Sequence, residues 1–308
     1  MIAPSFPIEQ ALTAFRSSRT LRDCFPEIPA DLFSRVMRYG APVGSRLEVH
    51  GKIPRCMGRL RDLIDRAGAG EEPVPSGTVI MARELANGCG RFDREWFAPR
   101  GGLWLALAWA DTLLPDYARM LPLAAGSACC QAVRSLGVDA KIKWVNDIHW
   151  QGRKMGGILC ETFCGKGAGD RYHIIGIGIN CNNVAFPPAL RKTSVSLQDV
   201  LGAPVALEEF APVLLGFLTW HLGLVHLHEE QSLAHRHDGA PGERDNPVIQ
   251  AWRKLSDTPG RKVVYGYDVV RQPLYTAVAR DVDQGGGLVL TLQNGETVVE
   301  TGGEILYL

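Results

Sequence analysis

One stretch near the middle of the chain gathers residue types that could handle an anionic group. Lys143 precedes the pair Asn146-Asp147, whose side chains can bond their own backbone and so favour a turn. Gly156 and Gly157 follow within an apolar run, and paired glycines in a strand mark close approach by a ligand or another backbone. The pattern predicts two strands joined by a turn, with a lysine at a strand end that could bind an anion. An ordinary hairpin with a solvated lysine is the alternative.

A second segment suits a phosphate group. Gly88 and Gly90 leave backbone N–H groups free to approach a phosphate, and Arg91 and Arg94 add charge-assisted donors. Taken alone, a Gly-x-Gly-Arg sequence is more typical of an ordinary mobile loop. Its position directly after a strong strand expected at 77–82 favours a functional loop.

The order of the residues in the central stretch resembles the signature of biotin protein ligases. That family has Lys-Trp-Pro-Asn-Asp and then Lys-x-Gly-Gly-Ile-Leu-x-Glu. Here 143–148 reads Lys-Trp-Val-Asn-Asp-Ile and 153–161 reads Arg-Lys-Met-Gly-Gly-Ile-Leu-Cys-Glu, so Val145 replaces the proline. The segment from Gly88 resembles the family's arginine- and glycine-rich loop, which continues into a Trp, a Pro and Gly-Gly-Leu.

The resemblance implies an enzyme with two half-reactions. The carboxylate of biotin attacks the α-phosphate of ATP to give biotinyl-AMP, and a lysine of a biotin carboxyl carrier protein or domain then takes the biotin. ATP, Mg²⁺ and biotin are the implied cofactors and substrates. Because a carboxylate and a triphosphate repel each other, the site must supply positive charge. Lys143 and Arg91 are the implied catalytic residues.

The resemblance also implies the remaining site residues. Cys56 and Met57 could equally be core residues, Trp96 could pack under the loop, and Asp147 is expected to brace the turn. Leu85 stands where the family has a glutamine that meets biotin, and Cys89 where it has an arginine. The implied biotin-binding residues are Arg55, Cys56, Met57, Leu85, Gly156 and Gly157. The implied adenylate-binding residues are Gly88, Cys89, Gly90, Arg91, Arg94, Trp96, Asn146, Lys154 and Asn180, and no metal ligand is expected.

Composition limits the class of protein. Of 308 residues, 46% are hydrophobic and 21% charged, and 33 Lys+Arg balance 33 Asp+Glu, so there is no overall basic field for nucleic acid. We expect no signal peptide and no apolar run of membrane-spanning length. The eight cysteines form no Cys-x-x-Cys pair, which favours reduced thiols in a cytoplasmic protein. The neighbours Cys129 and Cys130 suit a buried helix.

The fold expected is α+β, with a mixed-sheet catalytic domain of the biotin/lipoate ligase type and a small C-terminal SH3-like β-barrel. The expected domains are a helical appendage at 1–43, the catalytic domain at 44–258 and the barrel at 259–308. We expect an amphipathic helix at 207–227 with His221, His226 and His228 on its surface, and then a flexible insertion at 229–246. Other helices are expected at 8–16, 31–38, 54–64, 120–136 and 248–255. Strands are expected at 46–50, 103–110, 172–180, 262–265, 274–280, 287–292, 297–299 and 304–308.

Three other functions remain open at this point. A lipoate–protein ligase shares the fold and the chemistry. A relative that binds biotin or adenylate without turnover is consistent with Leu85 and Cys89. A DNA-binding repressor would need a helix-turn-helix, and residues 1–66 show no clear one, although eleven Lys/Arg outnumber seven Asp/Glu there. A homodimer is compatible with all of them.

Overall fold

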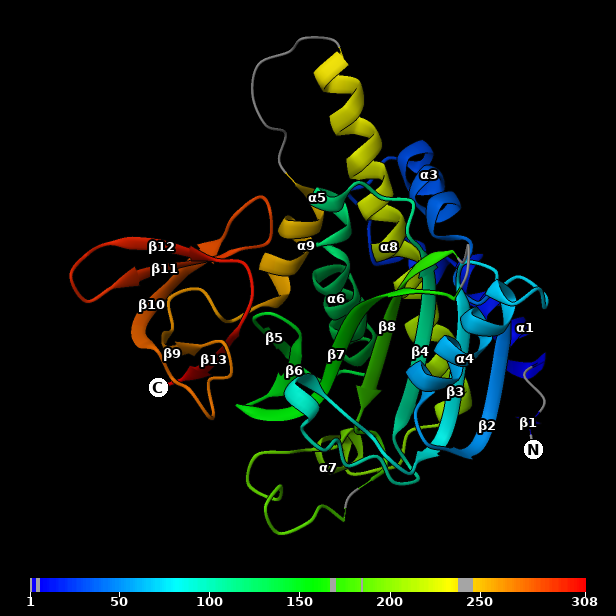
Figure 1. Ribbon diagram of the computed structural model, residues 1–308, viewed down its shortest axis with the longest axis horizontal. Coiled ribbons are helices and arrows are strands. Elements are labelled where there is room, and N and C mark those ends of the chain that lie inside the picture. Colours follow the sequence, from blue (N-terminus) through cyan, green and yellow to red (C-terminus); the bar gives the residue numbers. More distant parts are fainter. Residues whose placement is uncertain (1, 4–5, 167–169, 184, 238–245) are drawn as a thin grey trace.

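The computed structural model describes residues 2–3, 6–166, 170–183, 185–237 and 246–308. Eight strands form a mixed sheet: β1 (Ile2–Ala3), β2 (Leu47–Ile53), β3 (Thr78–Leu85), β4 (Leu103–Ala110), β5 (Lys141–Lys143), β6 (Asp147–Trp150), β7 (Arg153–Cys164) and β8 (Arg171–Ile179). Their order is β1-β2-β3-β4-β8-β7-β6-β5 (Figure 1). Only β2 and β3 pair in parallel among these neighbours, and the others are antiparallel. This confirms the expected α+β class.

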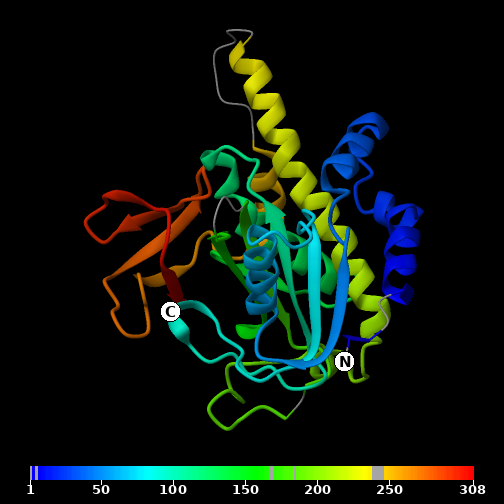
Figure 2. The ribbon, with the colours of Figure 1, turned by 45° about the vertical axis from the view of Figure 1, so that its right-hand side comes forward.

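Helices cover both faces of this sheet. The α-helices are α1 (Phe6–Arg16), α2 (Arg19–Asp23), α3 (Ala30–Gly40), α4 (Cys56–Gly68), α5 (Pro115–Ala118), α6 (Leu121–Arg134), α7 (Leu197–Leu201), α8 (Leu207–His237) and α9 (Pro247–Leu255). Figures 1 and 2 show α6 and α8 on one face and α4 on the other. Since both faces are covered, β4 reads as a continuous apolar run, Leu-Trp-Leu-Ala-Leu-Ala-Trp-Ala, as expected of a strand buried on both sides.

Helix α8 differs from its prediction. It runs ten residues beyond the expected end at 227, so the first part of the expected flexible insertion is helical; residues 238–245 of that insertion lie outside the described ones. The expectation that no apolar run reaches spanning length was wrong, because α8 is long and apolar enough. Yet 89% of its apolar window is buried inside the protein, which identifies α8 as a core helix.

The surface assignment of the histidines on α8 was also wrong. His221 is fully buried and His228 is 8% exposed, while His226 is half-buried and accepts a hydrogen bond from Trp109 Nε1 at 3.1 Å. The cause is that α8 packs between α1 and α3 on one side and α6 on the other, so no face of its middle is left to solvent. Cys129 and Cys130 of α6 are fully buried, as expected.

Helices α1 and α3 pack against α8. The ring of Trp220 stacks on Phe25, with centroids 4.1 Å apart, and on Phe33 at 5.0 Å. The additional short helix α2 was not expected; the Ser18 side chain caps it by accepting a hydrogen bond from the backbone N–H of Leu21.

The C-terminal strands form a separate antiparallel sheet of order β12-β11-β10-β9-β13. They are β9 (Lys262–Gly266), β10 (Tyr275–Val282), β11 (Leu288–Leu292), β12 (Thr297–Glu300) and β13 (Glu304–Tyr307). Each lies within two residues of its expected position. The small SH3-like C-terminal unit is therefore confirmed.

Candidate functional site

Two lysines share one carboxylate at the end of the large sheet. Lys143 Nζ lies 3.2 Å from Asp147 Oδ2, and Lys154 Nζ lies 2.6 Å from Asp147 Oδ1. Burial alone would raise the pKa of Asp147, but the two ammonium groups outweigh it and hold that pKa at about 2. The carboxylate is thus ionised at neutral pH. The three side chains together carry one net positive charge, which suits an anionic ligand.

The central stretch contains three strands where two were expected. The turn occupies 144–146, and Asp147 is already the first residue of β6. β6 then turns back at 151–152 into β7. Asp147 therefore braces the hairpin as expected, but from a strand, where its side chain can reach Lys143 and Lys154 together.

Asn146 and Asn180 have internal hydrogen-bond partners. The buried Asn146 amide donates to the carbonyl oxygen of Ile158, and the buried Asn180 Oδ1 accepts a hydrogen bond from Asn183 Nδ2 at 2.9 Å. Both side chains hold neighbouring segments together. Their predicted contact with an adenylate stays a prediction.

A row of glycines lies beside the lysine pair. Gly157 pairs with Asp147 on one side and with Gly178 on the other. A Cβ on Gly178 would lie 2.8 Å from Trp96 Nε1, so this position requires glycine where the indole covers the sheet. The Lys154 ammonium lies 5.2 Å from the centre of the same indole ring, within cation–π range. Trp96 therefore packs on the sheet and also borders the charged group.

The other predicted biotin-binding residues separate into two groups. Met57 lies over Gly176, which precedes Gly178 by two residues on β8 and extends the glycine row, because a Cβ on Gly176 would come within 2.6 Å of the Met57 sulfur. The predicted contact of Cys56 with biotin stays a prediction; Cys56 is only 3% exposed in the apolar core under α4, and burial raises the pKa of its thiol to about 12. The reason for this burial is helix geometry: Cys56 begins α4 on the side that faces β4.

Three further predicted residues have different surroundings. Arg55 is exposed, and its Nε donates to the carbonyl oxygen of Asn87 at 2.8 Å. Leu85 is half-buried at the end of β3 against the same core cluster. Gly156 lies on the opposite face from Gly157, and a Cβ there would meet the backbone oxygen of Gly178 at 2.8 Å. Gly156 therefore serves strand packing.

The loop that carries Arg91 and Arg94, called the basic loop below, contacts the C-terminal sheet. Arg91 Nη1 donates to the carbonyl oxygen of Gly303 at 2.7 Å, and Arg94 pairs with Glu304, 2.7 Å away, and with Asp268. Figure 2 shows this loop beside the C-terminus. Sequence reasoning missed these partners because they lie about two hundred residues away.

The glycines of the same loop keep its two sides together. Gly88 accepts a hydrogen bond from the backbone N–H of Trp96 at 2.9 Å, and a Cβ on Gly88 would meet the Trp96 carbonyl oxygen at 2.2 Å. Cys89 bridges to Glu95 across the loop, and Gly90 donates to the carbonyl oxygen of Arg94 at 2.9 Å. The loop is thus a small closed hairpin that presents both arginines.

Two hollows lie away from this group. One of about 600 Å³ is lined by residues that include Arg153, Phe186 and Arg191. Another of about 680 Å³ lies at the far end of β7 and β8, beside Thr162 and His173. Neither is lined by Lys143 or by the basic loop. Charge and the glycine row therefore distinguish the candidate site from these two hollows.

Comparisons with known proteins agree on one family. Residues 64–180 match the model of the Biotin/lipoate A/B protein ligase family. The chain is 29% identical over 246 residues to the bifunctional ligase/repressor BirA of Escherichia coli (strain K12), covering 79% of this chain and 69% of that protein. It is 29% identical over 258 residues to the biotin--[acetyl-CoA-carboxylase] ligase of Mycobacterium tuberculosis, covering 80% of this chain and 84% of that protein.

A solved structure supports the fold. The biotin protein ligase from Aquifex aeolicus in complex with biotin and ATP superposes with a TM-score of 0.67 and 21% sequence identity. The match covers 85% of this chain and 98% of that one. It includes enough of this chain to establish the shared fold.

Proposed function

We propose that this chain, which belongs to the biotin/lipoate A/B protein ligase family, is an ATP-dependent biotin protein ligase that acts through biotinyl-AMP. The observation that carries the proposal is the pair of ammonium groups, Lys143 and Lys154, around Asp147 beside the glycine row. A relative named as a biotin--[acetyl-CoA-carboxylase] ligase matches along 80% of the chain.

The charge distribution fits the first half-reaction. In it, a biotin carboxylate oxygen forms a bond to the α-phosphorus of ATP, and pyrophosphate leaves. Lys143 is a compact charge on a flexible stem, so it can stay close to the carboxylate as it approaches the phosphate. Asp147 limits where that ammonium can lie. Positioning and charge of this kind are the main contributions a protein can make to such a displacement.

The remaining roles are assigned by position. The face bordered by Met57 and Trp96, over Gly176 and Gly178, is where we place the biotin rings. The closed loop with Arg91 and Arg94 is where we place the phosphates. Mg²⁺ enters with ATP, as part of the substrate, to share the charge. The partner in the second half-reaction is a biotin carboxyl carrier protein or domain, and we propose a cytoplasmic enzyme, with a homodimer compatible with this assignment.

The decisive experiment is pyrophosphate exchange into ATP with biotin, lipoate or octanoate as the acid. We expect exchange with biotin and little with the other two. Exchange with lipoate alone would reassign the chain to the lipoate branch. Binding of biotin without exchange would identify a relative that lacks turnover.

A further inference from the structure

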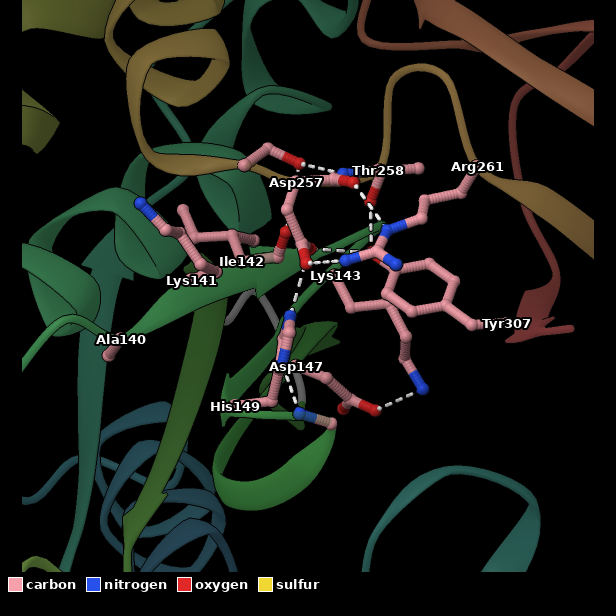
Figure 3. A network of polar contacts seen from close by, with 12 residues as sticks. Ala140, Lys141, Ile142, Lys143, Asp147, His149, Asp257, Thr258, Arg261 and Tyr307 are labelled. Carbon is pink, nitrogen blue, oxygen red and sulfur yellow. Dashed lines mark hydrogen bonds and ion pairs between the residues drawn. The ribbon is translucent and has the colours of Figure 1, made fainter. Parts of the chain in front are cut away.

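A hydrogen-bond network joins the hairpin that carries Lys143 to the C-terminal sheet (Figure 3). β5 is the edge strand of the large sheet and has only three residues. On its free side lies the connection between α9 and β9, which contains Ser256, Asp257 and Thr258. β13 contributes Tyr307 to the same network.

Both neighbours of Lys143 are held by this connection. The carbonyl oxygen of Ile142 accepts a hydrogen bond from Ser256 Oγ at 2.8 Å, and the backbone N–H of Trp144 donates to Thr258 Oγ1 at 3.0 Å. A short edge strand has unpaired backbone groups that would otherwise leave it free to move. The two contacts therefore fix the backbone on either side of Lys143.

Every proton in the network has a defined place. Asp257 is an acceptor only, because hydrogen bonds from His149, Tyr307 and Arg261 outweigh the effect of burial and hold its pKa at about 2. Tyr307 must therefore donate to Asp257 Oδ1, 2.9 Å away, and accept from the hydroxyl of Thr258, 2.8 Å away. The Thr258 oxygen is then free to accept the N–H of Trp144.

The second branch is equally defined. His149 Nδ1 accepts the backbone N–H of Gly152 at 3.2 Å, so its proton lies on Nε2, which donates to Asp257 Oδ1 at 2.9 Å. The His149 side chain is 7% exposed. Asp257 thus receives hydrogen bonds from both the C-terminal sheet and β6, and links the two ends of the hairpin.

We propose that Tyr307, Asp257, Thr258 and His149 are positioning residues that fix Lys143 for adenylate formation. The inference rests on the proposed function. It assigns the C-terminal sheet a part in that reaction. Tyr307 orients the hydroxyl of Thr258, and this hydroxyl holds the backbone of the hairpin in place. None of the four needs to touch a substrate.

The test is Tyr307→Phe, which keeps the ring against His149 and under the Arg261 guanidinium and removes only the hydroxyl. The matched control is Tyr275→Phe, which removes a hydroxyl of the same sheet that bonds Glu300 and is remote from the hairpin. Two quantities are measured: amide hydrogen exchange of residues 141–150, and the kcat and KM of biotin-dependent pyrophosphate exchange.

We expect faster amide exchange in the hairpin of Tyr307→Phe. We also expect a kcat lower by about 10- to 100-fold, because a small misplacement of a reacting group can cost about 100-fold. Tyr275→Phe should match the parent in both quantities. A purely structural role for Tyr307 would lower the melting temperature while leaving the kcat of the folded protein unchanged, and that result would overturn the inference.

The experiment also distinguishes a failure of the proposed function from a failure of this inference. If the parent itself shows no biotin-dependent exchange, the function is wrong, and hairpin amide exchange alone decides whether the network holds Lys143. Parental hairpin protection in Tyr307→Phe would then contradict it. Should Tyr307→Phe not fold, Thr258→Val removes the acceptor for Trp144 and is measured in the same way.

Discussion

The ammonium of Lys143 lies 3.2 Å from a carboxylate oxygen of Asp147, and the other oxygen of that carboxylate is bound by Lys154. One acidic residue thus holds two cations in place without neutralising both. The arrangement leaves net positive charge where an incoming carboxylate and a phosphate must be brought together.

Replacing Lys143 by alanine should abolish adenylate formation and leave the fold intact. The variant loses the charge that offsets repulsion between the two anionic reactants. Biotin-dependent pyrophosphate exchange and a melting curve check it. Lys141→Ala is the control, since Lys141 lies on the same strand and pairs with Asp139. Near-normal exchange in the Lys143 variant would remove this residue from the mechanism.

Arg91→Gly should still form biotinyl-AMP but release it. The Arg91 side chain links the loop to Gly303, so its removal frees the loop that we expect to retain the adenylate. The measurement is biotin label on an added bystander protein, with Arg119→Gly, outside the loop, as the control. Equal labelling by parent and variant would show that Arg91 does not retain the intermediate.

Leu85→Gln should tighten biotin binding with little effect on ATP. A polar group of biotin's ureido ring that is buried without a hydrogen-bond partner costs about 1–3 kcal/mol, or roughly 5- to 150-fold in binding. The glutamine side chain can supply such a partner, and leucine cannot. Calorimetric titration of biotin and a melting curve are compared for both forms. Leu85 is half-buried against the core, so a variant that binds no tighter and melts lower would identify this leucine as structural.

The chain should not bind DNA in a sequence-specific way. Its formal net charge is zero, and α1 and α3 pack on α8. Gel retardation with the full chain and with a form lacking residues 1–43 tests this. Salt-sensitive, sequence-selective retardation that is lost on the deletion would assign a repressor function, such as the Escherichia coli relative carries in its name.

Stability should fall as the pH is lowered from about 6.5. Burial lowers the pKa of His221 to about 3, so between these values the unfolded chain binds a proton that the folded chain does not. This histidine should contribute a slope of about 1.4 kcal/mol per pH unit to the free energy of unfolding. Denaturant unfolding at pH 7, 6 and 5 measures it. His221→Gln should flatten the curve and His235→Gln should not; parallel curves for both would contradict the assignment.

The sequence by itself determined most of the strands, most helices and the order of the chemical motifs. These features depend on local periodicity and on residues adjacent in the chain. They can be recognised without knowledge of the tertiary contacts, as in the apolar run of β4, the glycines of β7 and the Lys143 segment. The regularly spaced C-terminal strands were found for the same reason, since short strands between turn residues are a local pattern.

Only the tertiary structure decided which side chains meet. Arg94 and Glu304 are 210 residues apart, and nothing in either segment specifies the other. Cys56 and His221 became buried because neighbouring helices and strands cover their sides, a consequence of packing that the sequence around them does not encode. The link from Tyr307 to Lys143 arises in the same way, because an edge strand takes its missing partners from whatever segment the fold brings beside it.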